Sequence, residues 1–525
     1  MATQGSRLLP VFYTLLFTLV PVVFAGNHSF WIDEALTWNV ARLGSLHEVL
    51  AGIHAAATAG SSNAQMPGYL VYAWAWAQVG GFSETWSRWS NLPWLIILGW
   101  AWWHLAALLS WPGWRERSVF LSLPLISPFV VWYSLEYRPY AALISMGAVA
   151  VCGLVMALTG DSRGRWITLI SVVAAAYLHM LALILIPCIL AVVLILGRGH
   201  LRNALGRWRP QLAVGALLLA PIAFYYAYTL TLGARAPAFG ASAKNLTFII
   251  YEYLGFGGLG PSRHELHFGG QVEAFVTWLP SLALLSVPGL VLVARGAREL
   301  VTAEKEQISS AGRAILWIGA TVGGGGVMLL WIAALPAEFR ILGRHVAVLF
   351  PAFLGALGVL VLSPRIERWW QWAMVVLLLA ALGLSSARLV GTDYHARDDY
   401  RTAVRLVRER QEPGQLTIVL ANVDAYRYYD ASVDDFASSL EDLTEHGVLG
   451  RSRIILESPS QAEWDALLRY WSGPLLIVLG KPYFYDSHGV VREWLKNHDP
   501  GELIGAPATF ELWKVIRVPE VAAEL

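Results

Sequence analysis

An acidic pair, Asp33 and Glu34, follows the first long apolar stretch of the chain and could do acid–base chemistry. A carboxylate beside a membrane surface can take a proton from an attacking hydroxyl group, which raises a rate by about 10²- to 10⁴-fold. Two neighbouring carboxylates can alternatively hold a divalent cation. Acidic residues also stabilise a helix N-terminus without any further role. The pair therefore predicts a general base, a cation site or a favourable helix start.

A second group, Glu136, Arg138 and Tyr140, lies in a short turn between two apolar stretches. An arginine at that depth is costly unless an anion lies beside it, and Glu136 can supply that anion in a salt bridge. A guanidinium group also binds phosphate in bidentate fashion, and the phosphate of a lipid would arrive at this level of the membrane. The turn therefore indicates either a structural ion pair or a phosphate site.

Basic side chains occur at two further helix junctions. His179 interrupts an apolar stretch, where a lone histidine is more often a core residue than a ligand. Arg340, Arg344 and His345 lie together at another junction. Such a group can hold a phosphate or pyrophosphate headgroup, whereas arginines near a helix end can also simply extend toward the membrane interface.

The stretch 232–275 is longer than an ordinary connection and is rich in glycine. We interpret it as a lid over a lipid or sugar site, because loops of this length are usually functional or disordered. His264, Glu265 and His267 lack the spacing of a zinc motif, so no metal site is predicted there.

The elements that must position these residues are membrane helices. Of 525 residues, 56% are hydrophobic and only 14% are charged, which is far too apolar for an ordinary soluble protein. The net charge of +1 gives no reason to expect nucleic acid as a partner. Cys152 and Cys188 both lie in apolar stretches, so no disulfide framework is predicted.

Apolar stretches of about 20 residues predict transmembrane helices, because that length crosses the bilayer core of about 30 Å. We count eleven: 8–25, 89–110, 118–134, 139–159, 166–178, 180–197, 211–231, 276–294, 314–335, 345–362 and 369–387. The stretch 67–81 has only about 15 residues and is rich in tryptophan and tyrosine, so we interpret it as a juxtamembrane helix.

This assignment places the basic connecting segments and the N-terminus on one side, which the positive-inside rule identifies as the cytoplasm. The first loop, 26–88, and the long loop, 232–275, then lie outside. Residues 1–389 form the predicted membrane domain. Residues 390–525 alternate strand-length apolar stretches with helical ones, which predicts a small α/β domain outside the membrane.

The chain resembles the glycosyltransferase-C superfamily over about residues 8–400, especially bacterial members similar to protein mannosyltransferases and aminoarabinose transferases. The motifs that carry the resemblance are Asp33-Glu34, Pro67-Gly68-Tyr69, Ser87-Arg88-Trp89-Ser90, the stretch from Tyr133 to Tyr140, Leu178-His179 and Arg344-His345. The chain departs from relatives at Gln65-Met66-Pro67, where they often have His-Pro-Pro or Lys-Pro.

The resemblance implies an inverting transferase that moves a sugar from a polyprenyl-phosphate donor to a hydroxyl group of a lipid, glycan or protein. Asp33 would be the general base and Glu34 would position it or the acceptor. A divalent cation, if one is used, would bind to this pair. The residues expected to bind the donor phosphate or substrate are Tyr69, Arg88, Glu136, Arg138, Tyr140, His179, Arg340, Arg344 and His345.

Two other functions fit a polytopic membrane protein. A transporter or flippase of a lipid-linked sugar needs polar residues along a path through the helices, and these are sparse here. A scaffold protein would use its C-terminal domain and need no such number of spans. We therefore predict an integral protein of the bacterial cell (inner) membrane with its active site on the extracytoplasmic face.

Overall fold

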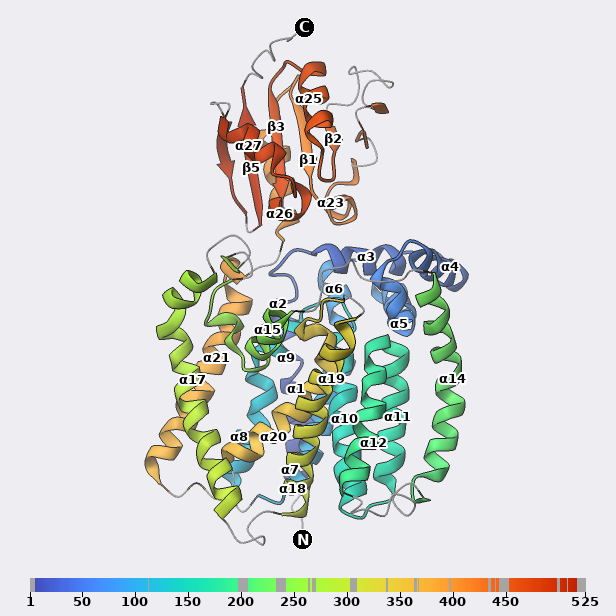
Figure 1. Ribbon diagram of the computed structural model, residues 1–525, viewed down its shortest axis with the longest axis vertical. Coiled ribbons are helices and arrows are strands. Elements are labelled where there is room, and N and C mark those ends of the chain that lie inside the picture. Colours follow the sequence, from blue (N-terminus) through green and yellow to red (C-terminus); the bar gives the residue numbers. More distant parts are fainter. Residues whose placement is uncertain are drawn as a thin grey trace. The chain divides into compact units, whose positions relative to one another are not determined.

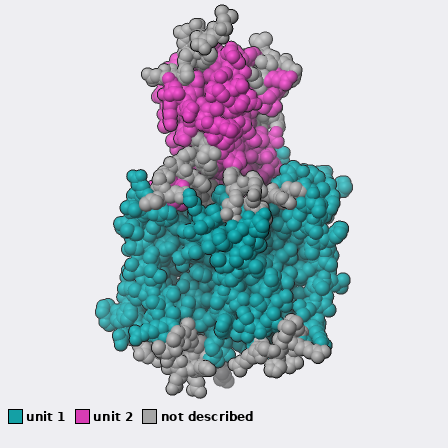
Figure 2. Space-filling model, viewed as in Figure 1, with its two compact units in different colours: residues 1–25, 40–261, 272–391 teal, residues 26–39, 262–271, 392–525 magenta. Residues whose placement is uncertain are grey.

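The computed structural model describes residues 5–516 in two compact units. The described range omits 112, 197–205, 233–241, 263–264, 267–270, 303–308, 337–338, 363–365, 367, 396–397, 433–435, 440, 443–452, 498–500 and 508. Unit 1 comprises residues 1–25, 40–261 and 272–391, and unit 2 comprises 26–39, 262–271 and 392–525 (Figure 2). Residues 26–39 and 262–271 thus group with unit 2, whereas the sequence placed them with residues 1–389.

Unit 1 is helical throughout its described residues (Figure 1). Its first half contains α1 (Gly5–Leu16), α2 (Leu19–Phe24), α4 (Leu46–Thr58), η1 (Ser62–Gln65), α5 (Pro67–Gly80), α6 (Glu84–Trp89), α7 (Leu92–Leu108), α8 (Trp114–Ile126), α9 (Pro128–Ser134), α10 (Tyr140–Leu158) and α11 (Arg163–Leu178). Its second half contains η2 (Met180–Ile184), α12 (Leu185–Leu196), α14 (Arg209–Thr231), α15 (Ala243–Tyr253), η3 (Phe256–Gly258), α17 (Gln271–Thr302), α18 (Ser310–Ile318), η4 (Gly319–Gly325), α19 (Gly326–Ala334), η5 (Gly343–Leu349), α20 (Phe350–Leu362) and α21 (Trp369–Gly391).

Six helical stretches among the described residues are long and apolar enough to cross a membrane. They are Tyr140–Leu158, Arg209–Thr231, Glu273–Glu299, Ser310–Ala334, Gly343–Leu362 and Trp369–Gly391. Each corresponds to one of the eleven predicted spans, so an integral membrane protein is confirmed while the count of eleven stays a prediction.

The other five predicted spans are helical but shorter or interrupted. The stretch 118–134 is divided between α8 and α9 at Ser127, whose backbone is extended with ψ 119°. Pro128 explains this break, because a proline disfavours the helical conformation of the residue before it. The stretch 67–81 is the helix α5, which has 14 residues and is not among the six.

Helix α10 is the central element of unit 1. It is buried along most of its length and packs against α7, α11, η5 and α20. Small residues permit this packing: a Cβ atom on Gly147 would lie only 2.1 Å from the carbonyl oxygen of Val348 in η5. The close approach holds η5, which carries Arg344 and His345, against the helix that begins directly after Arg138.

Unit 2 is built around a five-stranded sheet with the order β2-β1-β3-β5-β4. Its elements are α3 (Ile32–Ala41, of which 40–41 belong to unit 1), η6 (Asp393–His395), α22 (Tyr400–Arg410), β1 (Leu416–Leu420), α23 (Val423–Tyr429), β2 (Arg453–Ile455), α25 (Gln461–Tyr470), β3 (Leu475–Gly480), α26 (Pro482–Tyr485), α27 (Val490–Asn497), β4 (Gly501–Gly505) and β5 (Phe510–Val515). Strands β2, β1 and β3 are parallel, and β5 and β4 continue the sheet antiparallel.

The predicted small α/β fold at the C-terminus is confirmed. Every residue of β1 and β3 is buried, as expected for parallel strands with helices on both faces. Strand β4 is half-exposed at the sheet edge and follows an unremarkable polar stretch, so the sequence did not predict it.

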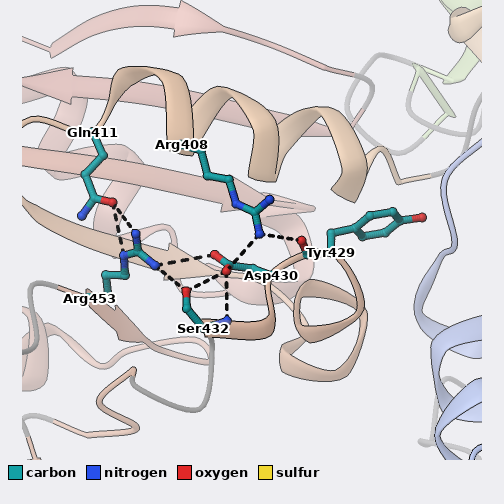
Figure 3. Close-up of polar contacts among 6 residues, drawn as sticks. All are labelled: Arg408, Gln411, Tyr429, Asp430, Ser432 and Arg453. Carbon is teal, nitrogen blue, oxygen red and sulfur yellow. Dashed lines mark hydrogen bonds and ion pairs between the residues drawn. The ribbon is translucent and has the colours of Figure 1, made fainter.

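One polar cluster ties α22, α23 and β2 together (Figure 3). Asp430 is buried and lies 3.3 Å from Arg408 and 3.7 Å from Arg453. Ser432 donates a hydrogen bond of 2.7 Å to Asp430, and Arg453 donates one of 2.8 Å to Gln411. Burial raises the pKa of Asp430, but the hydrogen bonds from Ser432 and Arg408 outweigh it, so the pKa lies below its usual value. The cluster therefore stabilises the ionised carboxylate.

Candidate functional site

The acidic pair begins helix α3 in unit 2. Glu34 is buried, and its carboxylate accepts a hydrogen bond of 3.4 Å from the backbone N–H of Trp31. This contact satisfies a donor that the helix itself leaves open at its N-terminus. Asp33 is only half-buried, and its carbonyl oxygen accepts a hydrogen bond of 3.1 Å from Thr37. Glu34 thus serves the helix start, and Asp33 is the more accessible carboxylate.

In unit 1, the turn that carries Arg138 is braced from two directions. The side-chain amide of Asn91 donates hydrogen bonds of 3.0 Å to the carbonyl of Ser134 and 2.7 Å to that of Glu136. The hydroxyl of Tyr137 donates one of 3.1 Å to the carbonyl of Ala73 in α5. Asn91 directly precedes α7 and was not singled out in the sequence, because an asparagine there resembles any helix cap.

The guanidinium group of Arg138 is buried and oriented by Asn63. Its Nη1 donates a hydrogen bond of 2.9 Å to Oδ1 of Asn63, which lies in η1 just before the departure from the family motif. Tyr69 is fully buried, and the charge of Arg138 acts on its phenol group. The predicted residues Tyr69 and Arg138 are therefore neighbours, and Asn63 is an additional partner.

The other predicted basic residues lie in the same neighbourhood. The positive charges of Arg138, Arg340 and Arg344 all act on the ring of His345. His179 acts electrostatically on the same ring. His179, which lies between α11 and η2, is buried, and this burial together with Arg138 and Arg344 lowers its pKa to about 3. The three arginines, His179 and His345 form a set that we name the cationic cluster.

Each histidine of the cationic cluster caps a helix start, His179 as the residue before η2 and His345 from the first turn of η5. Nδ1 of His179 accepts a hydrogen bond of 3.1 Å from the N–H of Leu181, and Nδ1 of His345 accepts one of 3.1 Å from the N–H of Leu342. A neutral imidazole that accepts through Nδ1 carries its proton on Nε2. Each ring can therefore present an N–H donor from its opposite edge.

An acidic side chain enters beside the cationic cluster from α15. A Cβ atom on Gly343 would lie 1.9 Å from Oε2 of Glu252, so this carboxylate packs directly on the backbone at the start of η5. Tyr133 donates a hydrogen bond of 3.4 Å to the same oxygen, and its ring lies 5.1 Å from that of Tyr140. Glu252 lies in the stretch 232–275 but was not chosen as a site residue from the sequence.

Arg88 has a structural contact in unit 1. It is buried, and its Nη1 donates a hydrogen bond of 2.7 Å to the carbonyl of Ala25 at the end of α2. The next residue, Trp89, donates one of 3.2 Å to the carbonyl of Pro21. These bonds fasten α6 to α2, and a role of Arg88 at a phosphate stays a prediction.

The long loop is described only in part. Arg263, His264 and His267 lie outside the described residues. Glu265 groups with unit 2, where its carboxylate accepts a hydrogen bond from the hydroxyl of Tyr394. No group of three or more histidine, cysteine, aspartate or glutamate residues that could hold a metal ion occurs within the described ranges.

The predicted site residues thus fall into two sets, each described within its own unit. Unit 2 contains Asp33 and Glu34. Unit 1 contains Tyr69, Arg88, Glu136, Arg138, Tyr140, His179, Arg340, Arg344 and His345. In unit 1, the charges of Arg138 and Arg344 act on both His179 and His345, and the charge of Arg340 acts on His345.

Comparison with known proteins finds similarity among solved structures. No protein-family model and no curated protein matches the chain. ArnT from Cupriavidus metallidurans in the apo state is 13% identical, covers 98% of each chain and has a TM-score of 0.44. ArnT bound to undecaprenyl phosphate is 12% identical over 98% of each chain, with a TM-score of 0.43.

The arabinofuranosyltransferase AftD from Mycobacteria is 14% identical, with a TM-score of 0.43 over 97% of this chain and 41% of the AftD chain. ArnT and AftD are both glycosyltransferases of the superfamily that the sequence motifs resemble. Because these TM-scores lie below 0.5, the proposals below rest on residues of this chain.

Proposed function

We propose that this chain is a membrane glycosyltransferase that takes a sugar from a polyprenyl-phosphate donor and transfers it to a hydroxyl acceptor. The observation that carries the proposal is the cationic cluster. In this cluster the charges of Arg138, Arg340 and Arg344 all act on His345, and those of Arg138 and Arg344 also act on His179. The cluster lies in the unit whose long apolar helices can cross a membrane.

A lipid phosphate is the ligand that this chemistry fits best. Guanidinium groups bind phosphate oxygens through paired hydrogen bonds, and they do so more strongly where water is scarce. Three like charges that act on the same ring repel one another, and a dianionic or monoanionic ligand offsets that repulsion. Neutral His179 and His345 add N–H donors without adding charge. A polyprenyl chain would be accommodated by the membrane itself.

In the proposed reaction, Asp33 accepts the proton of the acceptor hydroxyl while that oxygen forms a bond to the anomeric carbon. The bond from this carbon to the phosphate oxygen breaks on the opposite face, so the anomeric configuration is inverted. The negative charge that develops on the departing phosphate is stabilised by Arg138 and Arg344. Because Asp33 is the more exposed of the two carboxylates, it is the one assigned as base.

The sidedness follows from the positive-inside assignment and is part of the proposal. The active site then faces outward from the cell membrane, where sugar nucleotides are absent and lipid-linked sugars replace them as donors. The acceptor class is open among lipid, glycan and protein hydroxyl groups.

The test is sugar transfer by the full chain in nanodiscs, with a panel of radiolabelled sugars on undecaprenyl phosphate, the lipid bound in one ArnT structure. We expect Asp33→Asn to lower kcat by at least about 100-fold, in line with loss of a general base. Asp161→Asn, which changes an exposed carboxylate, serves as the matched control. Normal turnover by Asp33→Asn would contradict the assignment of Asp33 as the general base. Movement of the intact donor across the bilayer without transfer would favour a flippase instead.

A further inference from the structure

The sheet of unit 2 has an edge where α/β proteins commonly bind ligands. In the order β2-β1-β3, the chain passes from β1 to β2 on one side and then from β2 to β3 on the other side of β1. A topological switch point therefore lies at the carboxyl ends of β1 and β3, and crevices at such points hold ligands in open α/β sheets. The residues that follow these strands are Asn422, at the start of α23, and Lys481.

Here that edge is occupied by the chain's own segment 29–32. Lys481 lies with its Nζ 5.9 Å from the ring centre of Trp31. Ile32 packs against both hydrophobic clusters of unit 2, one of which contains Ile418 and the other Val419. Neighbouring residues of a strand point to opposite faces, so a side chain that touches both clusters lies across the end of the sheet.

Polar contacts fasten the same segment. Ser29 donates a hydrogen bond of 2.5 Å to the carbonyl of Asp398. The carboxylate of Asp398 is buried, lies 2.6 Å from Nζ of Lys481 and accepts a hydrogen bond of 2.9 Å from Thr509. Lys481 has a positive φ of 44°, which is unusual for a residue with a side chain. The side chain of Lys481 contacts both the Asp398 carboxylate and the Trp31 ring.

Helix α23 holds α3 on both sides of Asp33. Tyr429 accepts a hydrogen bond of 2.6 Å from the N–H of Phe30, and Asp424 accepts one of 2.8 Å from the side-chain amide of Asn39. Between these two bonds, the ring of Tyr428 lies 4.8 Å from Phe30 and 4.9 Å from Trp38. The segment that bears Asp33 is therefore clamped three residues before it and six residues after it.

We propose that the C-terminal α/β domain is the positioning element for Asp33, with Asp424 and Tyr429 as positioning residues for the reaction. This inference rests on the proposed function, because it assigns a role toward the base named there. The domain uses its switch-point edge for a segment of its own chain instead of a soluble ligand. Its effect on the reaction is to fix the direction of the Asp33 carboxylate.

The test exchanges the two polar side chains that join the helices, Asn39 of α3 and Asp424 of α23. Asn39→Asp sets one carboxylate against that of Asp424 and should lower kcat by about 10- to 100-fold, the cost of a small misplacement of a reacting group. The KM for the lipid donor should stay within about twofold, because the phosphate ligands are assigned to unit 1. The exchange variant, Asn39→Asp with Asp424→Asn, restores an amide–carboxylate pair and should recover kcat to within about threefold. Asp161→Asn, which changes an exposed carboxylate of unit 1, is the control.

Hydrogen exchange of the full chain in nanodiscs gives a readout that does not depend on turnover. Amides of α3 should exchange faster in Asn39→Asp and return to the original rate in the exchange variant. The same acceleration is expected for Tyr429→Phe, which removes the hydroxyl and keeps the ring. Unchanged exchange and kcat in Asn39→Asp would overturn the inference, even where Asp33→Asn is inactive and the proposed function stands. Normal turnover by Asp33→Asn would overturn the assignment of Asp33 as the base, and the inference about catalysis with it.

Discussion

Replacement of Arg138 by lysine separates its two possible roles, phosphate binding and a structural ion pair with Glu136. Lysine keeps the positive charge but lacks the planar fork that contacts two oxygens at once. Nη1 of Arg138 donates a hydrogen bond of 2.9 Å to Asn63, and this bond orients the guanidinium group. Loss of one hydrogen bond to a charged phosphate costs about 1.5–3 kcal/mol. Since 1.36 kcal/mol is tenfold in rate, kcat/KM should fall by about 10- to 150-fold.

The assay measures kcat/KM for the lipid-linked donor together with binding of undecaprenyl phosphate and the melting temperature in detergent. Asn63→Ala removes the neutral acceptor of this hydrogen bond. By itself it should lower kcat/KM by about fivefold, which corresponds to about 1 kcal/mol. In the Arg138→Lys background, Asn63→Ala should lower kcat/KM by a smaller factor, because the lysine has already altered the hydrogen bond to Asn63. The control is Arg88→Lys, because the guanidinium group of Arg88 donates a hydrogen bond to the carbonyl of Ala25. That change should lower the melting temperature more than it lowers lipid binding.

A different pattern would refute the reasoning. If Arg138→Lys lowers the melting temperature while the surviving protein binds the lipid and turns over normally, Arg138 serves the fold through its ion pair. The cationic cluster would then not be the phosphate site.

Two further predictions concern packing and pH. Gly147→Leu should reduce the yield of folded protein and lower its melting temperature, because even its Cβ would lie 2.1 Å from the carbonyl of Val348; Gly383→Leu, with open space around it, is the tolerated control. Asp430→Asn should destabilise unit 2 by about 1.5–3 kcal/mol near pH 7, measured by thermal unfolding. Because the folded pKa of Asp430 is depressed, its stabilisation is present above the unfolded value of about 3.9 and is lost as the pH falls through the folded pKa, so wild type and variant should converge in acid.

The sequence predicted the members of the cationic cluster because charge among apolar helices is conspicuous. Arg138, His179 and Arg344 each stand at a helix junction where a charged or polar group is costly. Their common neighbourhood could be expected from topology, since helix ends on one side of a membrane lie at one level. Asn63 and Glu252 could not be selected in this way, because short polar residues in loops and helix ends are ordinary.

The membership of α3 in unit 2 was not predictable from local patterns. The contacts that decide it join residues about 385 to 399 positions apart, as between Phe30 and Tyr429. No periodicity or composition near Asp33 records such a partner. The count of spans had a related weakness: hydropathy does not show where an apolar stretch is broken, as it is before Pro128.

The contacts that hold α3 also have a consequence for synthesis of the protein on the ribosome. Tyr429 is made 399 residues after Phe30, which at about 5–20 residues per second takes roughly 20–80 s. During that interval Phe30, Ile32 and Trp38 have left the ribosome without the partners that cover them in the finished domain. A chain that stops before α23 never gains those partners, so quality-control proteases would meet an uncovered apolar segment at its beginning.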